Sequence, residues 1–251
     1  MHIWSKFYIS RPLFAQDLLD CLQGIMASKL PQWSGALSVA ENDDSPPVAV
    51  SAAASLYDCL SKMMSSKSRL GSAVVTGDYD RLAFYLNYVD GAFPPELNRL
   101  AIELYNLQPM EGDDPVVCIK DLFKAISGQM PIRYANARDD EEFRAKNMID
   151  DETGVEAIGV DITEAIPGLY WLNYFGAPYV ELIGRERLLT APAFEVRALG
   201  EGVMLAMDQS PNNWQSADYY DREQAVVAHL GEQYFFSRWD PDRKTIAPDF
   251  Q

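Results

Sequence analysis

Positively charged residues are scarce in this chain of 251 residues. Lys and Arg together number 21 against 37 Asp and Glu, which gives a formal net charge of −16 at pH 7. Nucleic-acid binding draws most of its affinity from Lys and Arg contacts to phosphate, and anionic membrane surfaces attract the same residues. The composition therefore disfavours both partner classes. It allows a basic protein partner, although acidity of this kind also serves solubility alone.

Cysteine and histidine are rare as well. The three cysteines, Cys21, Cys59 and Cys118, form no CxxC pair, and each falls on the apolar side of an expected helix, which favours a reducing compartment. The two histidines, His2 and His229, have no Cys or His at ligand spacing, which disfavours a zinc site. The sequence also lacks a nucleophile elbow, a Walker loop and a dinucleotide-binding motif. We therefore expect no catalytic residue, no cofactor and no metal.

Long hydrophobic runs are missing. No stretch of about 18 consecutive apolar residues occurs, and residues 1–10 lack a basic region followed by an apolar run. Hydrophobic residues nevertheless make up 48% of the chain, which is ordinary for a folded globular protein. These features predict a cytoplasmic protein without a membrane-spanning segment.

The first half of the chain mixes the two hydrophobic periodicities. Alternation predicts three strands, at 2–9, 72–76 and 81–89, the last two joined as a hairpin. A 3.6-residue period predicts three helices, at 10–26, from Ala52 onward and at 97–107. A run of Gly, Asp, Asn and Pro predicts that residues 31–50 form a loop.

In the second half, Asp114 predicts the N-cap of a helix that has Pro115 in its first turn and ends at Gly128. Residues 129–168 show little regularity and are expected to form a long, irregular segment that contains some helix. The pattern then predicts a strand at 169–175, a helix at 178–184, a hairpin of 194–199 with 203–207, and a helix at 216–229. The aromatic residues that follow predict a tail that packs back on the sheet. These elements together predict an α+β fold, a mainly antiparallel sheet flanked by helices, in a single domain spanning residues 1–251.

Carboxylates are the one abundant reactive group, and they gather in the irregular stretch. Residues 107–166 hold 14 Asp and Glu against 6 Lys and Arg, which is half of the net negative charge. Adjacent acids point in different directions on a regular backbone, and no EF-hand spacing is present, which disfavours a Mg²⁺ or Ca²⁺ site. The stretch therefore predicts either a solvated face or a docking surface for a basic partner. Trp214 and Trp239 lie in expected loops, where each either packs in the core or anchors an interface.

Residues 165–250 resemble a known family. The resemblance is carried by Gly168-Leu169-Tyr170-Trp171-Leu172-Asn173-Tyr174-Phe175-Gly176, Tyr179-Val180-Glu181, Ile183-Gly184, Leu188-Leu189, Ala191-Pro192-Ala193, the turn at 200–205 and His229-Leu230-Gly231. This pattern is similar to immunity-protein family 52 of bacterial polymorphic toxin and type VI secretion systems. The resemblance implies a non-enzymatic antitoxin that binds its cognate toxin, typically a nuclease with a restriction-endonuclease fold. Within the motif, Trp171, Asn173, Tyr174 and Gly176 are expected to have packing roles and not to bind toxin.

The resemblance and the charge lead to one hypothesis. A nuclease needs a basic groove for its substrate, so an acidic binder complements that groove. We expect the toxin-binding surface to comprise Asp139, Asp140, Glu141, Glu142, Asp150, Asp151 and Glu152. Two alternatives stay open: a carboxylate-dependent, metal-using hydrolase, and an acidic scaffold or adaptor protein. Self-association as a homodimer is open as well.

Overall fold

The computed structural model describes residues 2–9, 20, 37–40, 46, 48–50, 58–59, 62, 70–76, 82–89, 98–104, 114–151, 154–240 and 242–250. Residue contacts divide the chain into two compact units, Met1–Ile132 and Arg133–Gln251. Each unit combines antiparallel strands with helix, which confirms the α+β class. The single domain over residues 1–251 stays a prediction, since two compact units can still unfold together.

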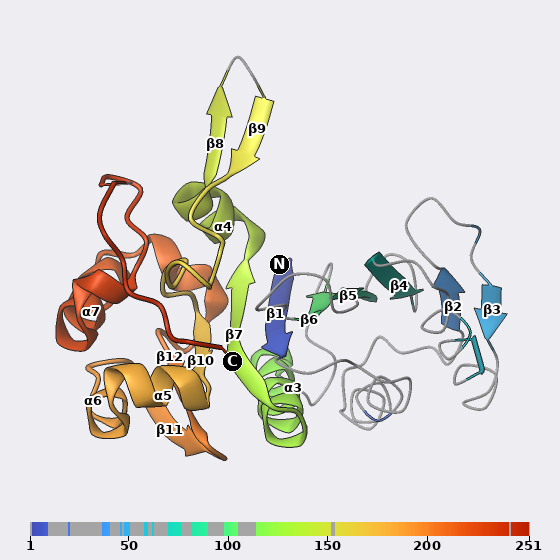
Figure 1. Ribbon diagram of the computed structural model, residues 1–251, viewed down its shortest axis with the longest axis horizontal. Helices are drawn as coiled ribbons and strands as arrows, with labels where there is room; N and C mark the ends of the chain where they lie inside the picture. The colour runs from blue at the N-terminus through green and yellow to red at the C-terminus, as the bar shows by residue number, and fades with distance from the viewer. Residues whose placement is uncertain are drawn as a thin grey trace. The chain divides into compact units, whose positions relative to one another are not determined.

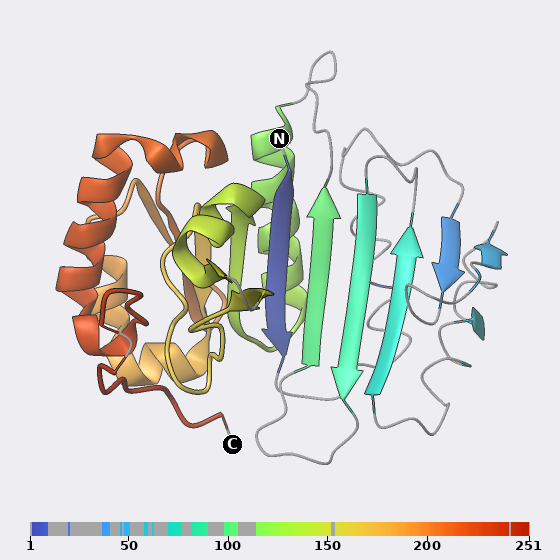
Figure 2. The same ribbon diagram turned by 90° about the horizontal axis from the view of Figure 1, so that it is seen from above.

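Six strands of the N-terminal unit form an antiparallel sheet. They are β1 (Ile3–Ile9), β2 (Leu37–Ala40), β3 (Val48–Val50), β4 (Leu70–Thr76), β5 (Leu82–Val89) and β6 (Asn98–Leu104). Their order is β1-β6-β5-β4-β2-β3, and Figure 2 shows β1, β6, β5 and β4 side by side. The first strand therefore pairs with the last, with Ile3 opposite Leu104.

The buried face of β1 contacts α3 (Pro115–Gln129). Ile3, Ser5, Phe7 and Ile9 are all buried, which confirms the expected inner face of β1, although Tyr8 of the other face is buried as well. The rings of Phe7 and Phe123 lie 5.1 Å apart between centroids. Asp114 caps α3 by accepting a hydrogen bond of 2.9 Å from the Val116 N–H, as predicted.

Two expectations for the N-terminal unit are wrong. Within the expected loop at 31–50, residues 37–40 and 48–50 form the strands β2 and β3, because they pair with each other and Val39 lies opposite Val48. Residues 98–104 form the strand β6 and not a helix. Leu100, Ile102 and Leu104 also alternate with period two, and pairing with both β1 and β5 selects that conformation.

The helices expected at 10–26 and after Ala52 lie mostly outside the described residues, although Asp20, Cys59 and Lys62 are helical. Cys59 and Cys118 are not joined in a disulfide, and Cys118 is buried, whereas Cys21 lies outside the described residues. None of the helices in the described ranges combines the length and hydrophobicity needed to cross a bilayer.

The C-terminal unit has a sheet in the order β11-β12-β10-β7. Its strands are β7 (Ile132–Asp139), β10 (Leu172–Phe175), β11 (Glu195–Leu199) and β12 (Gly202–Ala206). Its helices are α4 (Asp140–Asn147), α5 (Ala177–Ile183), α6 (Arg185–Leu189) and α7 (Ala217–Leu230), with 3-10 turns η1 (Pro211–Gln215) and η2 (Glu232–Tyr234). A separate hairpin of β8 (Met148–Asp151) and β9 (Gly154–Ala157) projects beyond α4 (Figure 1).

The expectation that residues 129–168 form a mostly irregular segment is wrong, although the expected helix is present. The segment holds β7, α4 and the β8–β9 hairpin. β7 lacks a clear pattern because its buried positions include Ala135, Asn136 and Arg138 as well as Tyr134. The expected strand near 169–175, helix at 178–184, hairpin at 194–207 and capped helix at 216–229 are confirmed with bounds that shift by one to three residues.

The family-like motif lies at the centre of this unit and has the packing roles expected of it. The buried Trp171 ring donates a hydrogen bond of 3.0 Å from Nε1 to the Asp208 carbonyl, and the Asn173 amide bonds both backbone polar groups of Tyr170. The Tyr174 hydroxyl donates to the Leu199 carbonyl at 3.3 Å, and the Gly176 N–H donates to the backbone at the start of β7. All four residues are therefore parts of the core.

The C-terminal tail packs back onto α5 and Ile166, whereas the expected packing on the sheet stays a prediction. Phe235 and Phe250 are buried, and Phe250 meets Tyr179 of α5 with ring centroids 5.9 Å apart. Backbone hydrogen bonds join Ile166 to the tail on both sides of Phe235. Trp239 is the exception, since 92% of its surface is exposed.

Candidate functional site

The structure places the two predicted acidic clusters at successive points of one segment. The first cluster begins at Asp139 and occupies the first turn of α4, and the second lies in β8, which begins directly after α4 ends. Asp150 is exposed, Asp151 pairs with Gly154 in the hairpin, and Glu152 lies outside the described residues. Arg144 interacts with acids of both clusters. Its pKa is raised by its hydrogen bond to Asp140 and by the charges of Asp140 and Asp150.

Two residues of the first cluster have a structural role at the start of α4. The Asp139 carboxylate accepts a hydrogen bond of 2.8 Å from the Glu141 N–H, which is an N-cap. Asp140 accepts from Arg144 Nε at 2.8 Å, one helical turn further along. Acids in the first turn also complement the positive end of the helix dipole. Glu141 and Asp150 remain as exposed acids without such a role.

Glu142 departs from the expected solvated face, because its side chain is fully buried. One carboxylate oxygen, Oε1, accepts hydrogen bonds from Lys146 Nζ at 2.8 Å and from the Tyr219 hydroxyl at 2.7 Å. The other, Oε2, is buried without a hydrogen-bond partner. In this conformation Glu142 is not available to contact a toxin.

Glu142 belongs instead to a buried polar cluster built from three segments. Lys146 Nζ donates to Glu142 of its own helix, to Glu223 of α7 at 2.9 Å and to the Leu169 carbonyl at 2.6 Å. The cluster holds two carboxylates around one ammonium, with Tyr219 as a further donor. It therefore fastens α4 to α7 through hydrogen bonds that span 77 residues of sequence.

The ionisable groups of this cluster hold their protons more tightly than usual. Burial raises the pKa of Glu142, even though the charge and hydrogen bond of Lys146 act against it. Burial by itself would lower the pKa of Lys146, but the charges of Glu142 and Glu223 outweigh it and raise that pKa. Burial and the charge of Glu142 raise the pKa of Tyr219 well above its ordinary value.

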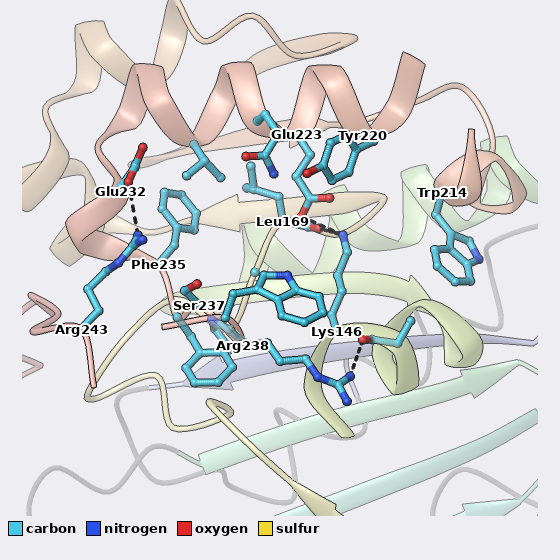
Figure 3. A pocket seen from close by; sticks show the side chains of 17 residues that line it. Lys146, Leu169, Trp214, Tyr220, Glu223, Glu232, Phe235, Ser237, Arg238 and Arg243 are labelled. Carbon is cyan, nitrogen blue, oxygen red and sulfur yellow. Dashed lines mark hydrogen bonds and ion pairs between the residues drawn. The ribbon is translucent and has the colours of Figure 1, made fainter. Parts of the chain in front are cut away.

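A groove with a volume of about 410 Å³ lies beside the cluster. Figure 3 shows it between α7, which contributes Tyr220 and Glu223, and the segment that contributes Phe235 and Arg238. Lys146 reaches the groove from α4, so the buried cluster forms part of the groove wall. We call this hollow the α7 groove.

Charged side chains in the α7 groove are engaged with partners inside the protein. Arg238 donates to the Ala145 carbonyl at 2.8 Å, and Arg243 pairs with Glu232 at 3.4 Å (Figure 3). Among the described residues, no group of three or more His, Cys, Asp or Glu is arranged to hold a metal ion. The charges of the carboxylates around Lys146 keep that lysine protonated, and a protonated lysine is not a nucleophile.

The α7 groove was not predicted from the sequence. The spacing of Glu142 and Lys146, four residues apart, is a local signal for an ion pair on a helix. Nothing in the sequence could pair Lys146 with Glu223, because they are brought together by the tertiary structure. Trp214 and Trp239, each expected either in the core or at an interface, both line the α7 groove.

The fold is shared with a protein of known structure. No protein-family model matches the chain, and no curated protein matches it in sequence. Among solved structures, the chain is similar to the Pseudomonas aeruginosa T6SS protein PA0821 with a TM-score of 0.58. The alignment covers 92% of this chain and 73% of that chain, at 14% sequence identity. At this identity the likeness shows a common fold, and functional residues do not transfer with it.

The structural similarity extends over more of the chain than the sequence resemblance does. The resemblance to immunity proteins rests on residues 165–250, whereas the structural similarity covers 92% of the chain and therefore includes most of both compact units.

Proposed function

We propose that this chain is an immunity protein that binds and neutralises a cognate toxin of a type VI secretion system or a related polymorphic toxin system. The observation that carries the proposal is the shared fold with a T6SS protein over 92% of the chain. The resemblance of residues 165–250 to immunity-protein family 52 supports the same assignment. Neutralisation by binding requires no catalytic residue in this chain.

The partner in this proposal is a toxin with a basic surface, such as a nuclease of restriction-endonuclease fold. The C-terminal unit supports a basic partner, because Arg133–Gln251 contains 22 Asp and Glu against 11 Lys and Arg. Such an excess steers a basic protein toward the unit and speeds association at low ionic strength. Occlusion of the toxin's substrate groove would follow from binding there.

Co-expression tests the proposal. The reading frame adjacent to the gene of this chain is expressed in a bacterial host from an inducible promoter, with and without this chain. We expect growth arrest with the adjacent frame alone, rescue with this chain, and a stable complex of the two purified products. A variant of this chain with an early stop codon is the matched control. Toxicity that this chain leaves unchanged would overturn the proposal.

A scaffold of the secretion apparatus is the second candidate, because a fold shared with a T6SS protein is equally compatible with a structural component. This candidate predicts co-purification with structural components of the apparatus in a strain that lacks the adjacent frame. Rescue from toxicity would not follow from it. The same two experiments therefore separate the two candidates.

A further inference from the structure

Trp239 stands out among the hydrophobic side chains of the described residues. It is 92% exposed, whereas the next most exposed large side chain, Tyr220, is 61% exposed and lines the same groove. Trp and Tyr are the residues most enriched among those that dominate protein–protein binding energy. An isolated exposed Trp beside a groove is therefore a candidate anchor for a partner.

The turn that carries Trp239 is held in place by the rest of the unit. The Asp240 N–H donates to the Ser237 carbonyl at 3.2 Å, and the Arg243 N–H donates to the Asp240 carbonyl at 3.1 Å. Arg238, the preceding residue, donates to the end of α4 at 2.8 Å. A pre-organised anchor loses little conformational entropy when it binds, so its contact area contributes more fully to affinity.

The base of this turn is packed closely. Gly159 has φ of +61°, and a Cβ at that position would overlap the ring of Phe236. Phe236 therefore lies directly on the backbone at Gly159, three residues before Trp239. The contact of Phe236 with Gly159 and the hydrogen bonds of the turn together fix the backbone that carries the exposed Trp239.

A second hollow, of about 500 Å³, adjoins the α7 groove and shares Phe236, Ser237 and Arg243 with it. We call it the acidic hollow. Its lining includes four carboxylates, Asp161, Glu164, Asp240 and Asp242, against two cations, Arg243 and Lys244. Arg243 is already shared between Glu232 and Asp240, so a net negative charge remains around the turn.

We propose that Trp239, the α7 groove and the acidic hollow form the surface on which the toxin docks. The inference rests on the proposed function and names its binding face. The complementary surface is basic: an Arg or Lys of the toxin stacks on the Trp239 ring and reaches the carboxylates beside it. This face differs from the seven residues expected at 139–152.

Charge also argues against a second copy of this chain as the occupant. The C-terminal unit has an excess of 11 negative charges, and apposing two such faces brings like charges together. A basic toxin relieves this repulsion, whereas self-association increases it.

The test measures affinity between the purified full chain and the purified product of the adjacent reading frame by isothermal titration calorimetry. Trp239→Ala is expected to weaken binding about 30-fold, which corresponds to the loss of one dominant interface residue. Trp239→Phe keeps an aromatic ring. Its loss of binding free energy is expected to be less than half of the loss in Trp239→Ala. Phe194→Ala is the matched control, because Phe194 is 50% exposed and lines neither hollow.

The outcomes separate this inference from the proposed function. Absence of binding by the unchanged chain would overturn both. Binding by the unchanged chain together with affinity of Trp239→Ala within threefold of it would overturn the docking face alone. A dimer of the unchanged chain in sedimentation velocity that Trp239→Ala converts to a monomer would assign the face to self-association and overturn its assignment to the toxin. Equal urea midpoints for the variants and the unchanged chain show that the affinities compare folded proteins.

Discussion

Glu142 Oε1 lies 2.8 Å from Lys146 Nζ, one turn further along α4, and the Glu142 side chain is completely buried. The same ammonium reaches Glu223 of α7 at 2.9 Å. One lysine therefore compensates two carboxylates that lie on different helices.

Replacement of that lysine should be costly. Lys146→Met removes the compensating charge from a buried carboxylate, and we expect a loss of about 3 kcal/mol in the free energy of unfolding, measured by urea denaturation. The matched control is Arg144→Met on the same helix, whose ion pair with Asp140 is largely solvated and whose loss should leave the urea midpoint almost unchanged. Equal midpoints for the two variants would contradict a special role for Lys146.

Stability should depend on pH through Glu142. Burial raises its pKa in the folded protein above the ordinary value of 4.5, so the folded state binds this proton more tightly than the unfolded chain does. The contribution of Glu142 is fully present below that value and is lost as the pH rises through its folded pKa. Glu142→Gln removes the titration.

Urea denaturation of the unchanged chain and of Glu142→Gln at a series of pH values measures this contribution. The free energy of unfolding of the unchanged chain minus that of the variant should fall as the pH rises above the ordinary value of 4.5. A constant difference over that range would show that the pKa of Glu142 is not raised.

Two glycines should respond in opposite directions to the same substitution. A Cβ at Gly202 of β12 would overlap the Tyr174 ring and approach the Phe175 carbonyl, so Gly202→Ala should cost about 2 kcal/mol of stability. Gly128 lies in α3, and outside its own helix no atom lies within 4 Å of the position that a Cβ would take. Gly128→Ala should therefore stabilise the protein by about 0.5 kcal/mol. Thermal unfolding of both variants checks the two signs.

The acidic residues expected at 139–152 can be tested through those that are exposed. Glu141→Lys with Asp150→Lys reverses two exposed charges and leaves the Asp139 cap in place. If these acids contact the toxin, affinity for the adjacent-frame product falls and its dependence on salt becomes weaker. Glu181→Lys with Glu186→Lys, at exposed acids of α5 and α6, changes the net charge by the same amount and is the control for net charge alone. Equal effects of the two changes would show long-range attraction without local contact.

If this chain acts only by binding a toxin, divalent metal ions should not stabilise it. Differential scanning fluorimetry with and without Mg²⁺, Mn²⁺ or Ca²⁺ should give the same Tm, because only a ligand that binds the folded state raises it. A Tm that rises with metal concentration would favour the hydrolase alternative.

Several elements were predictable because their signals are local. Asp114 with Pro115 marks the start of α3, and Ser216 with Gly231 bounds α7, since a cap and a terminating glycine act within one turn of the helix. The hairpin of β11 and β12 follows from Gly200 at its turn, whose φ is +56°. None of these elements needs a distant partner to be recognised.

Other elements were beyond local reasoning. β6 has residues compatible with helical and with strand periodicity, and only its pairing with β1 and β5 selects the strand. β7 buries Asn136 and Arg138, which no hydrophobic pattern predicts. Glu142, expected on an exposed acidic face, is buried because Lys146 compensates its charge.

The sequence by itself determined the α+β class, the capped helices, the hairpin turns and the excess of negative charge, because composition and one-turn signals suffice for these. The tertiary structure alone decided that Glu142, Lys146 and Glu223 meet, that Trp239 stands exposed beside the α7 groove, and that β2 and β3 form where a loop was expected. Each of these depends on contacts between residues far apart in the chain, and their energy is gained only when the chain has folded.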